Sequence, residues 1–277
     1  MTSLQLLCTD LDRTLIPNGF STELPEARQE FVNLISRYDI CLAYVSGRDR
    51  HRVHQVIRDY RLPFPDYIIA DVGSTIYTCR QERCFLVADW YQQIKEDWRE
   101  HSAMEICRWF ADIPSLELQE TDKQGRFKLS FYVSLSIDYD TLKQQLLTVA
   151  AEHHLAVNLI YSIDCEKKIG LLDLLPASAN KLTAIRYLMN SLGLQDNEVL
   201  FAGDSGNDLE VLSSELPAVL VANAQESVRQ QALRMAEAAG HKDQLYLAHG
   251  VTGNGHYADG IIEGIHFYYP ELKRHSK

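Results

Sequence analysis

Three short apolar segments in this chain each end at a polar residue, and this feature restricts the fold more strongly than any other. Stretches with apolar residues at helical spacing separate such segments, which indicates buried parallel strands joined by helices. In an open sheet of this kind, the carboxyl ends of the strands lie at one edge, where ligands bind. The polar residues are therefore expected to meet, although they are distant in sequence. The segments are residues 4–9, 40–45 and 198–203, followed by Asp10, Ser46 and Asp204.

The alternation of strands and helices is interrupted in the middle of the chain. Before the interruption, helical spacing covers residues 24–38 and a third strand is expected at 67–70. The pattern resumes after Pro176, with a helix over 181–192 that ends at Gly193. The chain thus predicts an α/β fold with a parallel sheet, into which a smaller α+β unit is inserted. The inserted part is expected to contain paired strands within 75–87, a helix over 90–111, and strands at 127–133, 157–163 and 169–175.

The composition excludes several classes of function. The 277 residues carry a formal net charge of −11, which opposes nucleic-acid binding. No segment reaches the roughly 20 apolar residues that span a bilayer, and the N-terminal sequence lacks a secretory signal, so we expect a cytoplasmic protein without a membrane partner. None of the six cysteines forms a CxxC pair, and buried reduced thiols are expected.

Two acidic clusters follow predicted strands. Asp10 and Asp12 lie two residues apart in DLDRT, so their side chains point the same way in extended backbone. Their mutual repulsion would be relieved by a divalent cation, which would leave one carboxylate as a nucleophile and the other as a general acid and base. Asp204, Asn207 and Asp208 lie in GDSGND, and their oxygens suit a hard cation.

Two further motifs offer groups that bind phosphate. Ser46 and Gly47 precede a predicted helix, and a hydroxyl with free backbone N–H groups at a helix start forms an anion site. Lys181 begins another predicted helix, where its ammonium would offset the charge of a nucleophile and a phosphate. Each motif is weak by itself, because a serine at a helix start more often serves only as a cap.

Taken together and in this order, the motifs resemble those of the haloacid dehalogenase (HAD) superfamily of phosphohydrolases. The resemblance covers essentially the whole chain and implies a Rossmann-like parallel-sheet core formed by residues 1–83 and 173–277. Residues 84–172 would form the inserted α+β cap of the Cof-type subclass IIB, which sets substrate specificity. Within that subclass the chain resembles sucrose-phosphate and mannosylfructose-phosphate phosphatases, through AYVSGR (43–48), PDYIIADVGSTIY (65–77) and LLDLLPASANK (171–181).

The resemblance implies a role for each matching residue. Asp10 would attack phosphorus, and Asp12 would protonate the leaving sugar oxygen and then deprotonate water. Mg²⁺ would be bound by Asp10, the backbone carbonyl of Asp12 and Asp204, with support from Asp208. The groups that would hold or orient the phosphate are Ser46, Gly47, Lys181 and Asn207.

The implied function is Mg²⁺-dependent hydrolysis of a sugar phosphate. The first candidate substrate is a disaccharide phosphate resembling sucrose 6-phosphate. Mannosylfructose phosphate is an alternative substrate, and a phosphotransferase or phosphomutase of the same superfamily is an alternative activity. The partner is a small sugar phosphate, and a monomer or weak dimer is expected. In the cap, Lys128 on a predicted strand is a candidate for the sugar hydroxyls, and Arg48 is a second candidate substrate contact.

Two other classes of protein are less compatible with the motifs. Response-regulator receivers also combine acids, a hydroxyl and a lysine on a parallel sheet, but they lack an acid two residues after the acceptor and a large insert. Asp12 therefore argues against a long-lived phosphate signal. A dinucleotide-binding module is disfavoured because no GxGxxG follows the first strand.

Overall fold

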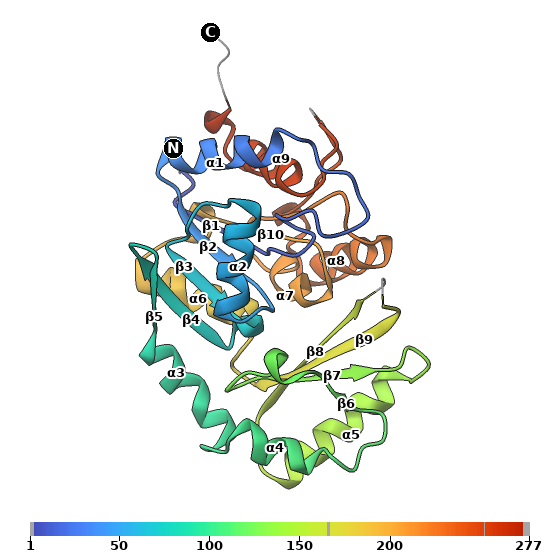
Figure 1. Cartoon of the computed structure of the whole chain (residues 1–277). Coiled ribbons are helices and arrows are strands. Elements are labelled where there is room, and N and C mark those ends of the chain that lie inside the picture. The colour runs from blue at the N-terminus through green and yellow to red at the C-terminus, as the bar shows by residue number, and fades with distance from the viewer. Residues whose placement is uncertain (1–2, 165–166, 252, 274–277) are drawn as a thin grey trace.

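The computed structural model describes residues 3–164, 167–251 and 253–273. An eight-stranded sheet forms the larger unit, in the order β12-β11-β10-β1-β2-β3-β4-β5 (Figure 1). Neighbouring strands from β12 to β3 run parallel, and β4 and β5 pair in antiparallel fashion. The strands are β1 (Leu6–Thr9), β2 (Cys41–Val45), β3 (Tyr67–Ala70), β4 (Thr75–Arg80), β5 (Arg83–Leu86), β10 (Val199–Gly203), β11 (Ala218–Leu220) and β12 (Leu245–Leu247).

Helices cover both faces of this sheet, because side chains alternate between the two faces along each strand. In β1, Leu7 packs with Phe31 of α1 (Ala27–Tyr38) and with α2 (Arg50–Tyr60) and α9 (Ala258–Tyr268). Leu6 and Cys8 belong to the opposite face, which α6 (Lys181–Leu192), α7 (Leu209–Leu212) and α8 (Glu226–Ala239) cover. The result is a three-layer, mostly parallel α/β unit, as the sequence predicts.

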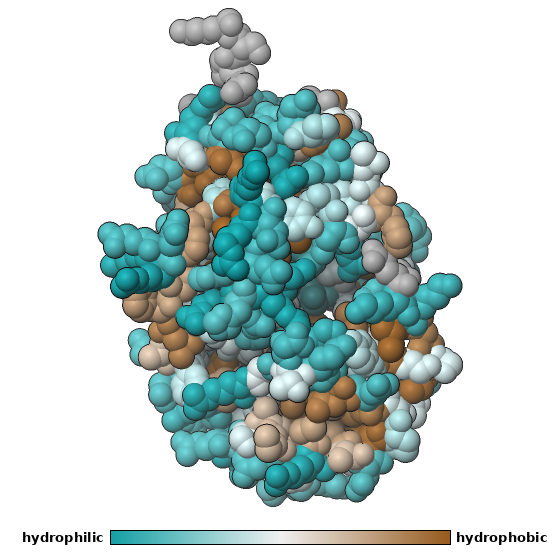
Figure 2. Space-filling view, viewed as in Figure 1, coloured by the Kyte–Doolittle hydropathy of each residue, from teal (hydrophilic) through white to brown (hydrophobic). Residues whose placement is uncertain are grey.

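A second, smaller sheet forms the cap, in the order β6-β7-β9-β8. Its strands face the large unit, and α4 and α5 lie on the far side (Figure 1). Figure 2 shows a largely hydrophilic face that is hollowed between the two units. The cap elements are α3 (Ala88–Lys95), α4 (Ala103–Trp109), β6 (Glu117–Leu118), β7 (Leu129–Val133), α5 (Tyr139–Glu152), β8 (Val157–Asp164) and β9 (Ile169–Pro176).

The sheets extend slightly past the predicted boundaries of the cap. The large sheet continues through β5 to Leu86, and β9 of the small sheet runs to Pro176, whereas the sequence places the crossings at 83/84 and 172/173. The division of the chain at those positions stays a prediction.

The single helix predicted over 90–111 is wrong. Helical structure stops after Trp98, because Arg99 and Glu100 adopt φ of 47° and 66°. A new helix, α4, then begins at Ala103, where Ser102 and Glu105 form a reciprocal capping box. Apolar periodicity continued across this break, so spacing alone did not reveal it.

The prediction that all cysteines are reduced is also wrong for two of them. Cys79 and Cys84 face each other across the β4–β5 hairpin and form a disulfide. Cys8, Cys41 and Cys107 are free, and burial raises the pKa of each thiol. Cys165 lies outside the described residues.

Across the part of the chain that the structure describes, every helix is too short or too polar to cross a membrane.

Candidate active site

The carboxyl ends of three adjacent strands bring the predicted polar residues together. In the sheet, β1 lies between β2 and β10, with Thr9 level with Tyr44 on one side and Ala202 on the other. Asp10, Ser46 and Asp204 directly follow these strands, and all three are buried. The convergence expected from the sequence is therefore a consequence of strand order.

Three carboxylates form a compact acidic group at this edge. One oxygen from each of Asp10, Asp204 and Asp208 lies within 4.8 Å of the others. Thr14 donates a hydrogen bond of 2.9 Å to Oδ1 of Asp204, and the guanidinium of Arg13 lies 3.5 Å from Oδ2. Thr14 and Arg13 alone do not neutralise the negative charge of these three buried carboxylates.

Lys181 is the buried cation of this group. Its Nζ lies 3.0 Å from Oδ2 of Asp10 and 2.7 Å from Oδ1 of Asp208, and the residue is only 1% exposed. Asn180 caps α6 by accepting a hydrogen bond from the N–H of Thr183, which fixes where the helix begins. The helix start thereby places the ammonium beside the first acidic residue.

Asp208 organises the loop after β10. Its Oδ2 accepts hydrogen bonds from the backbone N–H groups of Asp204 and Ser205 and from the Ser205 hydroxyl. Since Oδ1 is bound to Lys181, both oxygens of Asp208 have protein partners. Asp208 accepts four such hydrogen bonds, whereas Asp10 and Asp204 have two protein contacts each and so keep more capacity for a ligand.

Burial and mutual repulsion set the protonation of the acidic group. Burial raises the pKa of Asp10 to about 7; Lys181 opposes this shift, and Asp208 and Asp12 add to it. Burial also raises the pKa of Asp204 well above its usual value, with Asp208 and Asp10 adding to the effect and Arg13 opposing it. Negative charge at this site is therefore under-compensated by the protein.

The donor set fits Mg²⁺. Magnesium prefers a few carboxylate oxygens and keeps several waters, which matches the available oxygens of Asp10 and Asp204. A divalent cation would remove the charge imbalance that raises both pKa values. The side chain of Asp12 lies outside the group of three carboxylates.

Asp12 is held by Arg48. The Nε of Arg48 donates to Oδ2 of Asp12 at 2.7 Å, and Nη2 donates to Oδ1 at 2.6 Å, so the pair is bidentate. Asn18 adds a further short hydrogen bond to Oδ1. Arg48, which the sequence suggests as a substrate contact, thus binds the predicted acid and base.

The backbone around Ser46 is tied to neighbouring segments. The Ser46 hydroxyl accepts a 3.2 Å hydrogen bond from the N–H of Arg48, and the carbonyl of Gly47 accepts one of 2.9 Å from Nζ of Lys128. Lys128 comes from the cap, so a cap residue reaches the predicted phosphate-binding turn. Asn207 lies in the loop after β10, where its Oδ1 accepts a hydrogen bond from the hydroxyl of Ser205.

Asp71 is a residue at this site that sequence reasoning missed. Its Oδ1 lies 3.5 Å from Nζ of Lys128, and its Oδ2 accepts a hydrogen bond from Thr75. An acid directly after the third strand, at the same sheet edge as Asp10 and Ser46, was a signal that the sequence offered.

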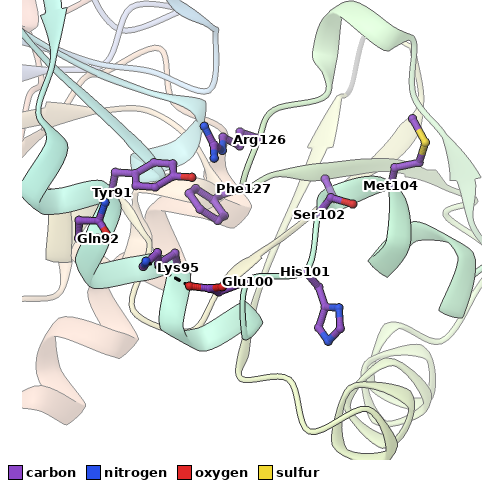
Figure 3. Close-up of a pocket in the computed structure, with 10 residues that line it drawn as sticks. Tyr91, Gln92, Lys95, Glu100, His101, Ser102, Met104, Arg126 and Phe127 are labelled. Carbon is purple, nitrogen blue, oxygen red and sulfur yellow. Dashed lines mark hydrogen bonds and ion pairs between the residues drawn. The ribbon is translucent and has the colours of Figure 1, made fainter.

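A cleft of about 410 Å³ lies between the two units beside Asp204. The core contributes Arg13, Asn207 and residues of α8, and the cap contributes Tyr139, Lys143 and Tyr161. A larger cavity of about 610 Å³ lies within the cap (Figure 3) and is lined by cap residues from Tyr91 to Phe127, none of them among the acidic residues above. The cleft, rather than the larger cavity, adjoins the chemistry.

The segment 253–257 contacts the loop that follows β1, which is one of the loops that form the site. Asn223 donates from its amide to the carbonyl of Arg13 and accepts from the N–H of Tyr257, and Asn254 and Tyr257 donate to the carbonyls of Thr22 and Ser21. These contacts fix the loop after β1.

The parallel-sheet fold, the inserted cap and the acid–lysine site together define a HAD-superfamily hydrolase. A model of the family "Sucrose-6F-phosphate phosphohydrolase" matches residues 3–269, and the chain belongs to this family. Membership makes the protein a phosphatase.

Individual relatives agree with this assignment. A protein of Nitrosococcus oceani, named only as a HAD-like hydrolase, is 46% identical over 97% of this chain and 72% of its own length. Sucrose-phosphatase 1 of Nicotiana tabacum is 30% identical over 95% of this chain, which spans only 59% of that relative. The crystal structure of the sucrose-phosphatase of Synechocystis sp. PCC6803, in complex with sucrose and phosphate, superposes with a TM-score of 0.77 at 25% identity, covering 96% of this chain and 98% of that one.

Proposed function

We propose that this protein is a Mg²⁺-dependent phosphatase of a disaccharide phosphate resembling sucrose 6-phosphate, acting through an aspartyl-phosphate. The observation that carries the proposal is the ammonium of Lys181, buried between Asp10 and Asp208 beside a cleft that cap and core both line. The matches to sucrose-phosphatases support the same substrate class.

Each of these residues has a separate role in the proposed reaction. Asp10 attacks phosphorus, and Lys181 and Ser46 hold the phosphoryl oxygens. Mg²⁺, held by Asp10 and Asp204, supplies charge neutralisation when bound. Asp12 protonates the leaving sugar oxygen and then takes a proton from the attacking water. Arg48 keeps the Asp12 carboxylate in one orientation.

We expect the cap residues that reach the site to select the sugar. Lys128 has an ammonium next to the phosphate-binding turn, and Tyr161 and Lys143 line the cleft. Mannosylfructose phosphate remains the alternative substrate. Cytoplasmic location and a monomer or weak dimer are retained as proposals.

The nucleophile is tested with Asp10→Asn. This variant should lose phosphate release from every substrate, because an amide cannot form the phosphoenzyme, while its thermal unfolding stays cooperative. Near-normal turnover by Asp10→Asn would refute the assignment.

Substrate and metal are tested together by phosphate release from a panel of monosaccharide and disaccharide phosphates without a sugar acceptor. Disaccharide phosphates should give the highest kcat/KM, EDTA should remove the activity, and Mg²⁺ should restore it. Full activity after exhaustive chelation would exclude the metal, and phosphate release only after addition of an acceptor would favour a phosphotransferase.

A further inference from the structure

The segment between β3 and β4 is a strained turn at the edge of the site. It comprises Asp71, Val72 and Gly73, whose φ angles are 53°, 58° and 101°. Positive φ is unfavourable for residues with a side chain, above all for a β-branched one such as Val72. Strain of this kind persists only where surrounding contacts hold it, and such turns cluster at functional sites.

The contacts that hold this turn come from both phosphate-binding motifs. The N–H groups of Asp71 and Val72 donate to the carbonyls of Arg48 and Ser46, each at 3.1 Å. Gly73 lies so close to the start of α6 that a Cβ there would be 2.2 Å from the carbonyl oxygen of Asn180. The turn is therefore fixed relative to the Ser46 segment and to Lys181.

The cap reaches the same turn through two residues. Trp90 of α3 donates from its indole Nε1 to the carbonyl of Gly73 at 3.1 Å. Lys128 places its ammonium 3.5 Å from Oδ1 of Asp71 and 2.9 Å from the carbonyl of Gly47. Lys128 is 5% exposed and Asp71 is 7% exposed, so both charges are withdrawn from water.

The backbone of Lys128 is fixed by the cap. A tight turn closes where the N–H of Gly125 donates to the carbonyl of Lys128 at 3.0 Å. At its tip, the guanidinium of Arg126 lies 4.3 Å from the ring centroid of Tyr91, and Phe127 packs beside the same ring (Figure 3). The ring of Phe127 also contacts Trp98. The lysine thus has a fixed base and a flexible four-carbon stem, and its partners in the core determine where the ammonium lies.

We propose that Asp71 is a positioning residue that orients the ammonium of Lys128 toward the sugar phosphate, across the boundary between cap and core. The carbonyl of Gly47 accepts a hydrogen bond from the ammonium, and Asp71 faces it as an ion pair at 3.5 Å, which leaves donor capacity for a sugar hydroxyl of the substrate. The inference rests on the proposed function and deepens it. It adds that a carboxylate of the core, Asp71, fixes the position of the cap's lysine, Lys128.

The test is Asp71→Asn, which keeps the shape of the side chain and removes its charge. Initial rates are measured with Mg²⁺ on sucrose 6-phosphate, or on the disaccharide phosphate that the panel selects, and on p-nitrophenyl phosphate. KM for the sugar phosphate should rise about tenfold with a smaller change in kcat, which is the size of one lost charge-assisted contact. Both parameters for the aryl phosphate should stay close to those of the parent protein.

A double-mutant cycle with Lys128→Met identifies the partner. If Asp71 acts through Lys128, the double variant should lose no more than Lys128→Met alone, whereas additive losses would overturn the proposal. Thr75→Val is the matched control, since it removes one neutral hydrogen bond from Asp71 and should change KM much less.

The remaining outcomes are also decisive. Equal losses on both substrates together with a lower unfolding temperature would show a merely structural role for Asp71 and overturn the proposal. If Asp71→Asn does not fold, Lys128→Met decides, because the absence of a sugar-selective rise in KM there contradicts the inference. Failure of the proposed function has a different signature, in which the parent protein releases phosphate from no sugar phosphate.

Discussion

At the scale of residues, the two acids of the DLDRT motif have opposite surroundings. Asp10 is buried against Lys181, whereas Asp12 is about one third exposed at 32% and is clamped by Arg48. The spacing of the two acids leaves open which of them is the nucleophile, and the resemblance to the HAD superfamily assigns that role to Asp10. In the structure the proposed nucleophile, Asp10, lies beside a buried cation, whereas the proposed acid and base, Asp12, is partly exposed to solvent.

Arg48→Lys distinguishes a clamp on Asp12 from a contact with the sugar. Lysine cannot reproduce the bidentate geometry, so Asp12 should lose its fixed orientation and kcat should fall about tenfold. The loss should be equal for sugar and aryl phosphates, because both need a proton at the leaving oxygen. Steady-state kinetics on both substrates measure it, and a loss confined to the sugar phosphate would instead place Arg48 in the sugar pocket.

At the scale of elements, helix α9 holds the last part of the sheet edge in place. Its Glu263 is buried, and one carboxylate accepts hydrogen bonds from the hydroxyl of Tyr246 and from the N–H groups of His249, Gly250 and Val251. Burial alone would raise the pKa of Glu263, but these donors hold it below its usual value. The helix therefore caps the loop that follows β12 through a single charged group.

Glu263→Gln should lower the free energy of unfolding by about 1–2 kcal/mol, because an amide offers fewer acceptor sites to these donors. The pKa of Glu263 is lower in the folded protein than in the unfolded one. Its stabilisation is thus present above the unfolded pKa of about 4.3 and lost as the pH falls through the folded pKa.

Urea unfolding at about pH 7 and about pH 3 checks this expectation. The difference in stability between the parent protein and Glu263→Gln should shrink at the lower pH. A difference that is the same at both pH values would contradict the role of the ionised carboxylate. Gln230→Ala on α8, which removes an exposed amide bonded to Glu226, is a control that should change little.

At the scale of the whole molecule, an acidic protein surrounds an acidic site. The chain carries a net charge of −11, and the group of Asp10, Asp204 and Asp208 concentrates negative charge where cap and core meet. Lys181 alone does not balance three buried carboxylates. Stability of the whole fold is therefore expected to depend on the metal.

Mg²⁺ should raise the unfolding temperature of the parent protein by several degrees relative to EDTA, because a ligand that binds only the folded state stabilises it. Asp204→Asn should lose this response and should be at least as stable as the parent in EDTA, since one buried negative charge is gone. Differential scanning fluorimetry with and without Mg²⁺ measures both. An equal shift in the parent and in Asp204→Asn would show that the metal binds elsewhere.

The sequence by itself determined the parallel core, the inserted cap and the identity of the acids and the lysine at the site. Those features follow from local periodicity and from residues next to strand ends, and local pattern is what a sequence records directly. The helix break at Arg99 was not visible, because apolar spacing continued across residues that adopt positive φ. Helix α9 was not predicted; seven of its eleven residues are buried, so the polar face that would mark a surface helix is small.

Only the tertiary structure decided which polar groups pair with one another. Arg48 binds Asp12 from 36 residues away, and Lys128 binds Gly47 from 81 residues away. Such pairs depend on how loops from different strands and from the cap are brought together by packing of the two sheets. A charged side chain with a long stem has many possible partners within reach, and the packed fold selects among them.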